Sequence, residues 1–304
     1  MLIDEFGNTE TVPPASWRDY YALTKPRVVQ LLVFTAIVGM FLATPGMVPW
    51  DALIFGSLGI GLAAASGAAV NHVLDQRLDA EMTRTRDRPL PSGRISERDA
   101  LGFAIGLGLL GLAVLVMFVN PLTAALTFAS LIGYAVIYTV YLKRATPQNI
   151  VIGGAAGAAP PVLGWAAVQN DVSGYALLLF LIIFTWTPPH FWALAVARRS
   201  DYEKAEIPML PVTHGEELTK SFIVYYTILL VIVTLLPYLT GMSGPLYLLA
   251  AILLGAGFLY YALLLKFAPA ANTPMITFAY SISYLMALFL FLLVDHYIPA
   301  LWPA

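Results

Sequence analysis

Nine apolar segments, each about long enough to cross a bilayer, constrain this chain more than any other feature. A helix needs about 20 apolar residues to span the hydrocarbon layer. The segments lack the alternation of every second residue that membrane-barrel strands show, so we predict helices. We expect an all-α transmembrane domain over residues 27–294, a bundle around a central cavity, with helices at 27–43, 51–71, 99–118, 121–141, 149–168, 174–197, 220–240, 244–266 and 273–294.

The low content of charged residues agrees with an integral membrane protein. Of the 304 residues, 59% are hydrophobic and only 11% are charged. A soluble domain carries about 25% charged residues. The chain has no cysteine, which excludes disulfides and thiolate metal sites.

The sixteen lysines and arginines all fall on one side of a nine-helix weave. The positive-inside rule assigns that side to the cytoplasm. We therefore expect a cytoplasmic N-terminal segment at 1–26, a short outer tail at 295–304, and insertion into the bacterial inner membrane. The N-terminal segment lacks the basic and apolar regions of a secretory signal.

Two connections on the cytoplasmic side are long and ionic, at 72–98 and 198–219, whereas the outer connections are short and nearly uncharged. We expect these two loops to carry the chemistry of the protein.

A regular pattern of oxygen-bearing side chains runs from the end of the second predicted helix into the first ionic loop, at Asn71, Asp75 and Asp79. Each step of four residues advances about 40° around a helix, so the three share one stripe. Like charges four residues apart destabilise a helix by a few tenths of a kcal/mol. A bound Mg²⁺ would compensate, because it prefers carboxylate and amide oxygens. The alternative is that the helix end is simply solvated, with Arg77 pairing with either aspartate.

The second ionic loop offers further carboxylates, Asp201, Glu203 and Glu206. Two acidic loops at one membrane face are suited to hold Mg²⁺ ions and a diphosphate between them. Arginine and lysine would complete such a clamp, since arginine matches phosphate oxygens. For each basic side chain the alternative is that it lies on this side only because of the positive-inside rule and binds no phosphate. The candidates are Arg84, Arg88, Lys143, Arg144 and Lys204.

A diphosphate held by metal beside an apolar bundle is suited to the ionisation of an allylic diphosphate. Metal ions and cations stabilise the leaving group as its charge grows. The bundle supplies an apolar pocket for an isoprenyl tail and keeps water from the allylic cation.

The aspartate pattern, followed by MTRTRDRPLPSG, resembles the first signature of the UbiA-type intramembrane polyprenyltransferases, typified by 4-hydroxybenzoate polyprenyltransferase. That resemblance covers nearly the whole chain and implies nine transmembrane helices. It also implies that Asn71, Asp75, Asp79 and Asp201 hold the metal and act in catalysis. The chain departs from the family at Ala205, where a second aspartate is usual, so Glu203 or Glu206 would have to complete the second site.

Three further stretches resemble one branch of that family, the protoheme IX farnesyltransferases or heme O synthases. They are YLKRATPQNIVIGGAAGAAPPVLGWAA at 141–167, TWTPPHFWALA at 185–195 and DYEKAEIPMLPVTHG at 201–215. The resemblance implies that the farnesyl group of farnesyl diphosphate joins a vinyl group of heme b. Water then adds, and heme O and diphosphate leave. It further implies a heme A synthase or a terminal oxidase assembly as the recipient of the product.

His190 is the histidine that best suits a heme acceptor. It lies about two turns before the cytoplasmic end of its predicted helix, and an ionisable group at that depth is by default a functional hypothesis. We expect it to bind heme, with Trp186 and Trp192 lining the cleft. The alternative is a neutral histidine bonded to a carbonyl that Pro188 and Pro189 leave free.

Two other functions stay open at this point. One is prenyl transfer to a different aromatic or tetrapyrrole acceptor. The other is secondary transport, which places ionisable groups and broken helices near the bilayer midplane. The ions of this chain crowd one face instead.

Overall fold

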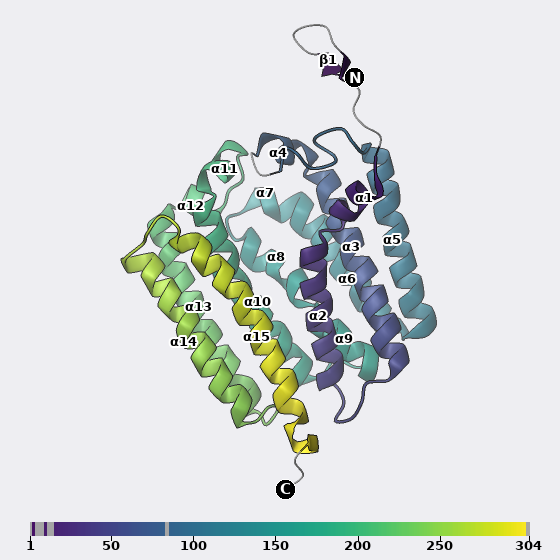
Figure 1. Ribbon diagram of the computed structural model, residues 1–304, viewed down its shortest axis with the longest axis vertical. Helices are drawn as coiled ribbons and strands as arrows, with labels where there is room; N and C mark the ends of the chain where they lie inside the picture. The colour runs from purple at the N-terminus through teal and green to yellow at the C-terminus, as the bar shows by residue number, and fades with distance from the viewer. Residues whose placement is uncertain (1, 4–8, 11–14, 83–84, 302–304) are drawn as a thin grey trace.

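The apolar segments form long helices that run from one end of the molecule to the other (Figure 1). The structure is a computed structural model that describes residues 2–3, 9–10, 15–82 and 85–301. Apart from one short antiparallel ladder, β1 (Leu2–Ile3) with β2 (Thr9–Glu10), the described chain is helical. The predicted all-α class is therefore confirmed.

The helices follow the order of the predicted segments. The first half of the chain forms α1 (Trp17–Leu23), α2 (Pro26–Leu42), η1 (Ala52–Gly56), α3 (Ser57–Leu74), α4 (Gln76–Glu81), α5 (Glu97–Phe118), α6 (Pro121–Ile132), η2 (Gly133–Leu142) and α7 (Lys143–Ala145). The second half forms α8 (Asn149–Ala158), α9 (Pro160–Gln169), α10 (Gly174–Ala197), α11 (Arg199–Lys204), α12 (Leu210–Thr213), α13 (Glu216–Leu239), α14 (Pro245–Phe267) and α15 (Thr273–Leu301).

Eight helices in the described residues are long and apolar enough to cross a membrane. The one remaining predicted segment, 27–43, corresponds to α2, which has 17 residues and is joined to α1 at a bend of 53°. The two together pass the same test of length and hydropathy, so the described chain has eight such helices, or nine if the bent pair counts as one span.

The helices of the middle of the chain lie at the centre of the bundle. About 61% of the α8–α9 span and of the α10 span is buried, against 17% for the span from α6 to α7. Helix α10 packs against α8, α13 and α15. Its buried residues join Trp165, Tyr247 and Phe289 in the largest apolar cluster. The sparsely buried spans expose leucine and isoleucine side chains, as lipid-facing helices do.

Two predicted helices have internal irregularities. The segment predicted at 149–168 is divided between α8 and α9 at Ala159, because Pro160 has no amide hydrogen to continue the ladder. The segment predicted at 121–141 changes from α6 to the ten-residue π-helix η2. Short π-helical stretches often mark functional positions.

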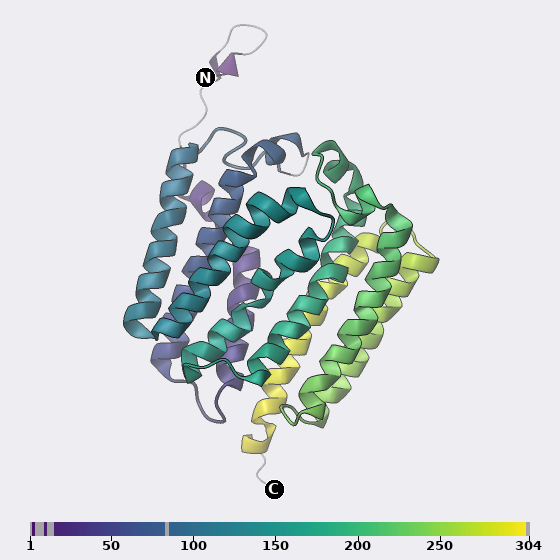
Figure 2. The same ribbon diagram turned by 180° about the vertical axis from the view of Figure 1, so that it is seen from behind.

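The short helices α4, α11 and α12 gather at one end of the bundle, which we call the charged end (Figure 1). The view from behind shows the same arrangement (Figure 2). Both predicted ionic loops therefore lie at the same end, with short helices inside each of them.

Two glycines allow the backbones of α2 and α9 to touch. A Cβ atom at Gly164 would overlap the carbonyl oxygen of Ala36, and one at Gly39 would overlap the carbonyl oxygen of Pro161. Backbone atoms cannot rotate away as a flexible side chain can, so any larger residue must push the two helices apart.

We predict that Gly164→Ala lowers the free energy of unfolding by about 1–3 kcal/mol, the usual cost of overpacking. Thermal unfolding in detergent would measure it. Gly157→Ala is the matched control, because a Cβ atom there meets nothing within 4 Å. Equal melting temperatures for the two variants would contradict the close approach of α2 and α9.

Candidate active site

The first acidic motif lies where α3 meets α4. Helix α3 ends at Leu74, beyond the predicted end at residue 71, and α4 begins at Gln76, so the predicted stripe is divided between two helices. The amide of Asp75 still donates to the carbonyl of Asn71 at 3.0 Å, and that of Asp79 to the carbonyl of Asp75 at 2.8 Å. The helical register therefore continues through the junction, and the motif stays on one face. Asn71, Asp75 and Asp79 are all buried, at 5%, 4% and 5% exposure.

Each side chain of the motif meets a cationic partner. The Lys143 ammonium lies 2.6 Å from a carboxylate oxygen of Asp75. The Arg88 guanidinium lies 2.7 Å from Asp79. Asn71 accepts a hydrogen bond from Lys25 and donates one to Asp75 at 2.8 Å. The alternative of a solvated helix end, with Arg77 as the partner, is therefore wrong.

Lys25 is a site residue that sequence reasoning missed. It has a left-handed backbone, with φ of +48°, directly before Pro26 begins α2. This conformation is unusual for a residue other than glycine, and it forms the bend that brings the ammonium group to Asn71. A Lys-Pro pair at the charged end of the first apolar segment was the available signal.

Thr139 is the second residue that was missed. Its hydroxyl donates to the carbonyl of Tyr134 at 2.9 Å and accepts from the Asn71 amide at 3.4 Å. Thr139 lies within η2, where the wider turns change which residues face inward. The sequence of an apolar segment does not indicate where α-helical winding changes to π-helical winding, so the position of Thr139 could not be predicted.

His72 is buried beside the motif without a hydrogen-bond partner for either ring nitrogen in the described part of the chain. Its Nδ1 atom lies 3.9 Å from the Asp79 carboxylate. The arrangement leaves both nitrogens available to a bound molecule or water.

The described carboxylates of the second acidic loop form no metal-binding group with Asp75 and Asp79 in this structure. Asp201 lies on α11 and is half-buried, while Glu203 is exposed. Among the described residues, no three His, Asp or Glu side chains come close enough together to hold a metal ion. Asp201 thus stays a prediction, whereas Asn71, Asp75 and Asp79 lie together in the described part of the chain.

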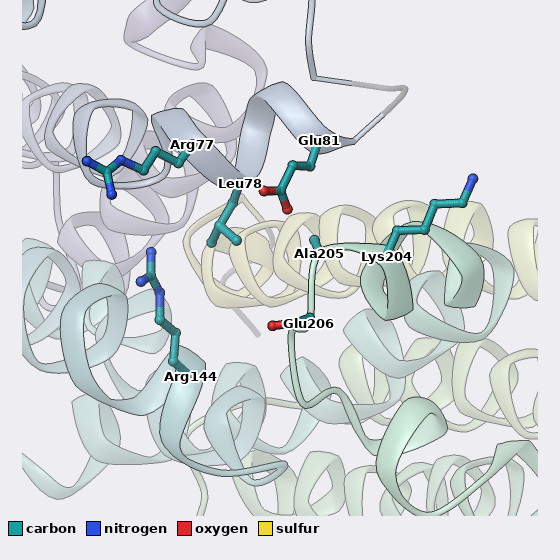
Figure 3. Close-up of a pocket in the computed structure, with 7 residues that line it drawn as sticks. All are labelled: Arg77, Leu78, Glu81, Arg144, Lys204, Ala205 and Glu206. Carbon is teal, nitrogen blue, oxygen red and sulfur yellow. The ribbon is translucent and has the colours of Figure 1, made fainter.

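The predicted diphosphate residues divide into two groups. Arg88 and Lys143 contact the motif, whereas Arg84 lies outside the described residues. Arg144 and Lys204 instead line a separate cavity of about 410 Å³ (Figure 3). The residues around that cavity are Arg77, Leu78, Glu81, Arg144, Lys204, Ala205 and Glu206.

His190 lies in α10 with two aromatic rings stacked on its imidazole. The ring centroid of Trp186 lies 4.2 Å from that of His190, and the ring centroid of Phe278 lies 4.6 Å from it. The Nδ1 atom lies 2.6 Å from the hydroxyl of Ser281, and the Trp186 indole donates to the Ser281 carbonyl at 2.9 Å. Two of the predicted acceptor residues are thus brought together.

Trp192 faces a different part of the core. Its ring packs edge-on against Phe222 and Tyr226 of α13, and it is almost fully buried. The structure therefore does not bring Trp192 together with His190.

Residues 32–293 match the UbiA prenyltransferase family. The chain belongs to the UbiA prenyltransferase family. Two protoheme IX farnesyltransferases, from Alkalilimnicola ehrlichii and Methylococcus capsulatus, are each 64% identical to it over 283 residues. The alignments cover 93% of this chain and 94% and 95% of those proteins. The predicted resemblance to this branch of the family is confirmed.

Solved structures of this family share the fold at low sequence identity. A digeranylgeranylglyceryl phosphate synthase superposes with a TM-score of 0.76 at 20% identity, covering 92% of this chain and 98% of that one. A UbiA homologue from Archaeoglobus fulgidus, bound to DMAPP and Mg²⁺, superposes with a TM-score of 0.61 at 17% identity, covering 88% and 99%. A UbiA-like helical fold is therefore shown.

We predict that Lys143→Met destabilises the protein, because it leaves the buried Asp75 carboxylate without its cation. Breaking a buried pair from one side costs about 3–5 kcal/mol. The double variant Lys143→Met/Asp75→Asn should recover part of that loss, since the uncompensated charge is gone.

Thermal unfolding of both single variants and the double variant measures this coupling. Lys266→Met is the control, because the Lys266 ammonium contacts the Ser221 hydroxyl and the Phe267 ring but forms no ion pair with a carboxylate among the described residues. Additive losses in the double variant would contradict a direct Asp75–Lys143 interaction.

Proposed function

We propose that this chain transfers the farnesyl group of farnesyl diphosphate to a vinyl group of heme b, with addition of water, giving heme O and diphosphate. The observation that carries the proposal is the 64% identity, over 93% of the chain, to proteins named protoheme IX farnesyltransferase. A buried cluster of carboxylates and cations at one end of an apolar bundle supports the same chemistry.

The first motif would hold Mg²⁺ together with the diphosphate of the donor. The fit rests on the chemistry of the donor set, because Asn71, Asp75 and Asp79 offer amide and carboxylate oxygens. Mg²⁺, when bound, would stabilise the negative charge that develops on the departing diphosphate. A homologue whose structure is titled as bound to DMAPP and Mg²⁺ supports this role. We propose Asp201 as a further contributor from the second loop.

The cations of the motif would bind the diphosphate oxygens. Arg88 and Lys143 already lie beside the two carboxylates, and Lys25 reaches Asn71 from the other side. We propose Arg84 for the same role. As the bond between carbon and oxygen breaks, its electron pair leaves with the diphosphate, and these side chains counter that charge. The apolar helices around them exclude bulk water from the allylic cation.

The acceptor completes the reaction. The vinyl group supplies the electron pair for the new carbon–carbon bond, and the positive charge moves to the heme side chain. A water molecule then adds there and loses a proton, which yields the hydroxyl group of heme O. The product would pass to a heme A synthase or to a terminal oxidase.

We propose that His190 presents its Nε2 atom to the acceptor. The Ser281 hydroxyl donates its one proton to the carbonyl of Phe278 at 2.6 Å. It must then accept from Nδ1–H of His190, so that proton resides on Nδ1. The lone pair of Nε2 is left free, as heme iron requires of an axial histidine.

We propose nine transmembrane spans, with α2 as the first, an N-terminus in the cytoplasm and a C-terminus outside, in a bacterial inner membrane. The one-sided distribution of lysine and arginine supports this orientation. The site would then open toward the cytoplasm.

Purified protein in nanodiscs should convert heme b and farnesyl diphosphate to a farnesylated heme in the presence of Mg²⁺. Mass spectrometry of the extracted heme checks this, with 4-hydroxybenzoate as the competing acceptor. If 4-hydroxybenzoate were prenylated and heme b were not, the acceptor would be another aromatic compound and not heme b.

The controls for this assay are metal removal and Asp75→Asn. Chelation of Mg²⁺ and the substitution should each reduce turnover by at least about 100-fold, a typical loss for a main charge-stabilising group. The variant should still insert and fold. Full activity in Asp75→Asn would remove the metal site from the mechanism.

His190→Ala should alter the absorption spectrum of bound ferric heme b, because an axial ligand is lost. Ser281→Ala is the matched variant, since it keeps the imidazole but removes the hydroxyl that accepts from Nδ1. Identical heme spectra in the wild type and His190→Ala would exclude ligation, and His190 would then be a structural residue.

A further inference from the structure

Helix α4 has a second charged face that the donor site does not use. Successive residues of a helix are about 100° apart, so Arg77 and Glu81 lie about 160° around α4 from Asp79. Asp79 is buried toward Arg88, while Arg77 and Glu81 line the cavity between α4, α7 and α11. Its volume, about 410 Å³, is in the range of small-molecule sites.

The basic side chains of this cavity are free to bind an anion. Lys143 and Arg88 are engaged by the aspartates of the motif. By contrast, Arg77 and Arg144 form no ion pair with a carboxylate in the part of the chain that is described. Two guanidinium groups near each other without a counter-ion favour a ligand with two anionic groups.

The cavity is also polarised. In Figure 3 the guanidinium groups of Arg77 and Arg144 lie on one side of Leu78, and the carboxylates of Glu81 and Glu206 lie on the other. The glutamates repel an anion from their own side, so an anionic ligand would bind against the arginines.

An apolar region joins the cavity to the proposed acceptor site. Leu78 lines the cavity and packs against the cluster that contains Trp192, with Phe278 at its edge. The ring of Phe278 in turn stacks on His190 at 4.6 Å. The charged lining of the cavity and this apolar cluster therefore adjoin at Leu78, which suits a ligand that is apolar at one edge and anionic at the other.

Heme b has this form, because its two vinyl groups and its two propionate carboxylates lie on different edges of the porphyrin. Burial of the carboxylates in the apolar bundle without partners would cost several kcal/mol, so they must stay at the charged end. We propose that Arg77 and Arg144 bind the two carboxylates of the tetrapyrrole acceptor. The proposal rests on the proposed function, and it assigns Arg144 to the acceptor rather than to the diphosphate.

The test compares heme b with its dimethyl ester, which lacks both anionic groups. Binding of each to protein in nanodiscs is titrated by absorption, and KM for farnesyl diphosphate is measured separately. We expect Arg77→Gln and Arg144→Gln each to raise the Kd for heme b about tenfold, in line with the loss of a charge-assisted hydrogen bond. Neither should change the Kd for the ester or KM for farnesyl diphosphate.

Two further variants control for charge. Arg98→Gln removes an exposed arginine at the start of α5 that does not line the cavity, and it should leave heme b binding unchanged. Glu81→Gln removes a repelling carboxylate from the cavity, and it should leave heme b binding equal or tighter.

Several outcomes would overturn the proposal. A raised KM for farnesyl diphosphate with unchanged heme b binding would make the cavity part of the diphosphate site. Equal losses for heme b and its ester would indicate a structural role, and weaker heme b binding in Glu81→Gln would indicate a cation site.

If the wild type made no farnesylated heme, yet the arginine variants weakened binding of heme b alone, the proposed reaction would fail while the carboxylate site would stand.

Discussion

Two buried carboxylates at one end of an apolar bundle set the conditions for the rest of this structure. A charge removed from water without a partner costs several kcal/mol, so Asp75 and Asp79 require cations within contact distance. Those cations come from elements far apart in the chain. Lys143 follows η2, Arg88 lies in the loop after α4, and Lys25 reaches Asn71 from the bend before α2. The convergence of these elements on one junction is what defines the charged end of the bundle.

Helix α4 separates two environments because its opposite faces meet different surroundings. Its inner face carries Asp79 beside the cations of the donor site, and its outer face carries Arg77 and Glu81 beside a cavity. The neighbours Lys143 and Arg144 divide in the same way, since consecutive residues on a helix point about 100° apart. A reaction that joins two substrates needs them close together but separately held, and a single charged helix between the two proposed sites would meet both needs.

The sequence was informative where one physical property dominates. Long apolar segments and one-sided charge predicted the all-helical bundle, and a spacing of four predicted that Asn71, Asp75 and Asp79 share a face. Contacts that depend on packing could not be predicted in this way. Ser281 lies 91 residues from His190, and nothing in either local sequence links them.

The second acidic loop was expected to complete a metal cluster, but Glu206 has a left-handed backbone, with φ of +50°, and lines the outer cavity. Lys25 was not predicted as a site residue because the positive-inside rule already explains a lysine at a membrane boundary.

The π-helix η2 has a consequence for how this segment tolerates changes in length. Its ten residues are wound more widely than an α-helix, and Lys143 follows its last residue directly. Loss of a single residue without any change in winding would turn everything after it by about a quarter of a turn and move Lys143 away from Asp75. Substitutions that keep the segment apolar preserve its length and therefore this register. The span from α6 to α7 is the least buried of the eight long apolar helices, yet the Lys143 ammonium at its end must reach Asp75, and that contact constrains its length.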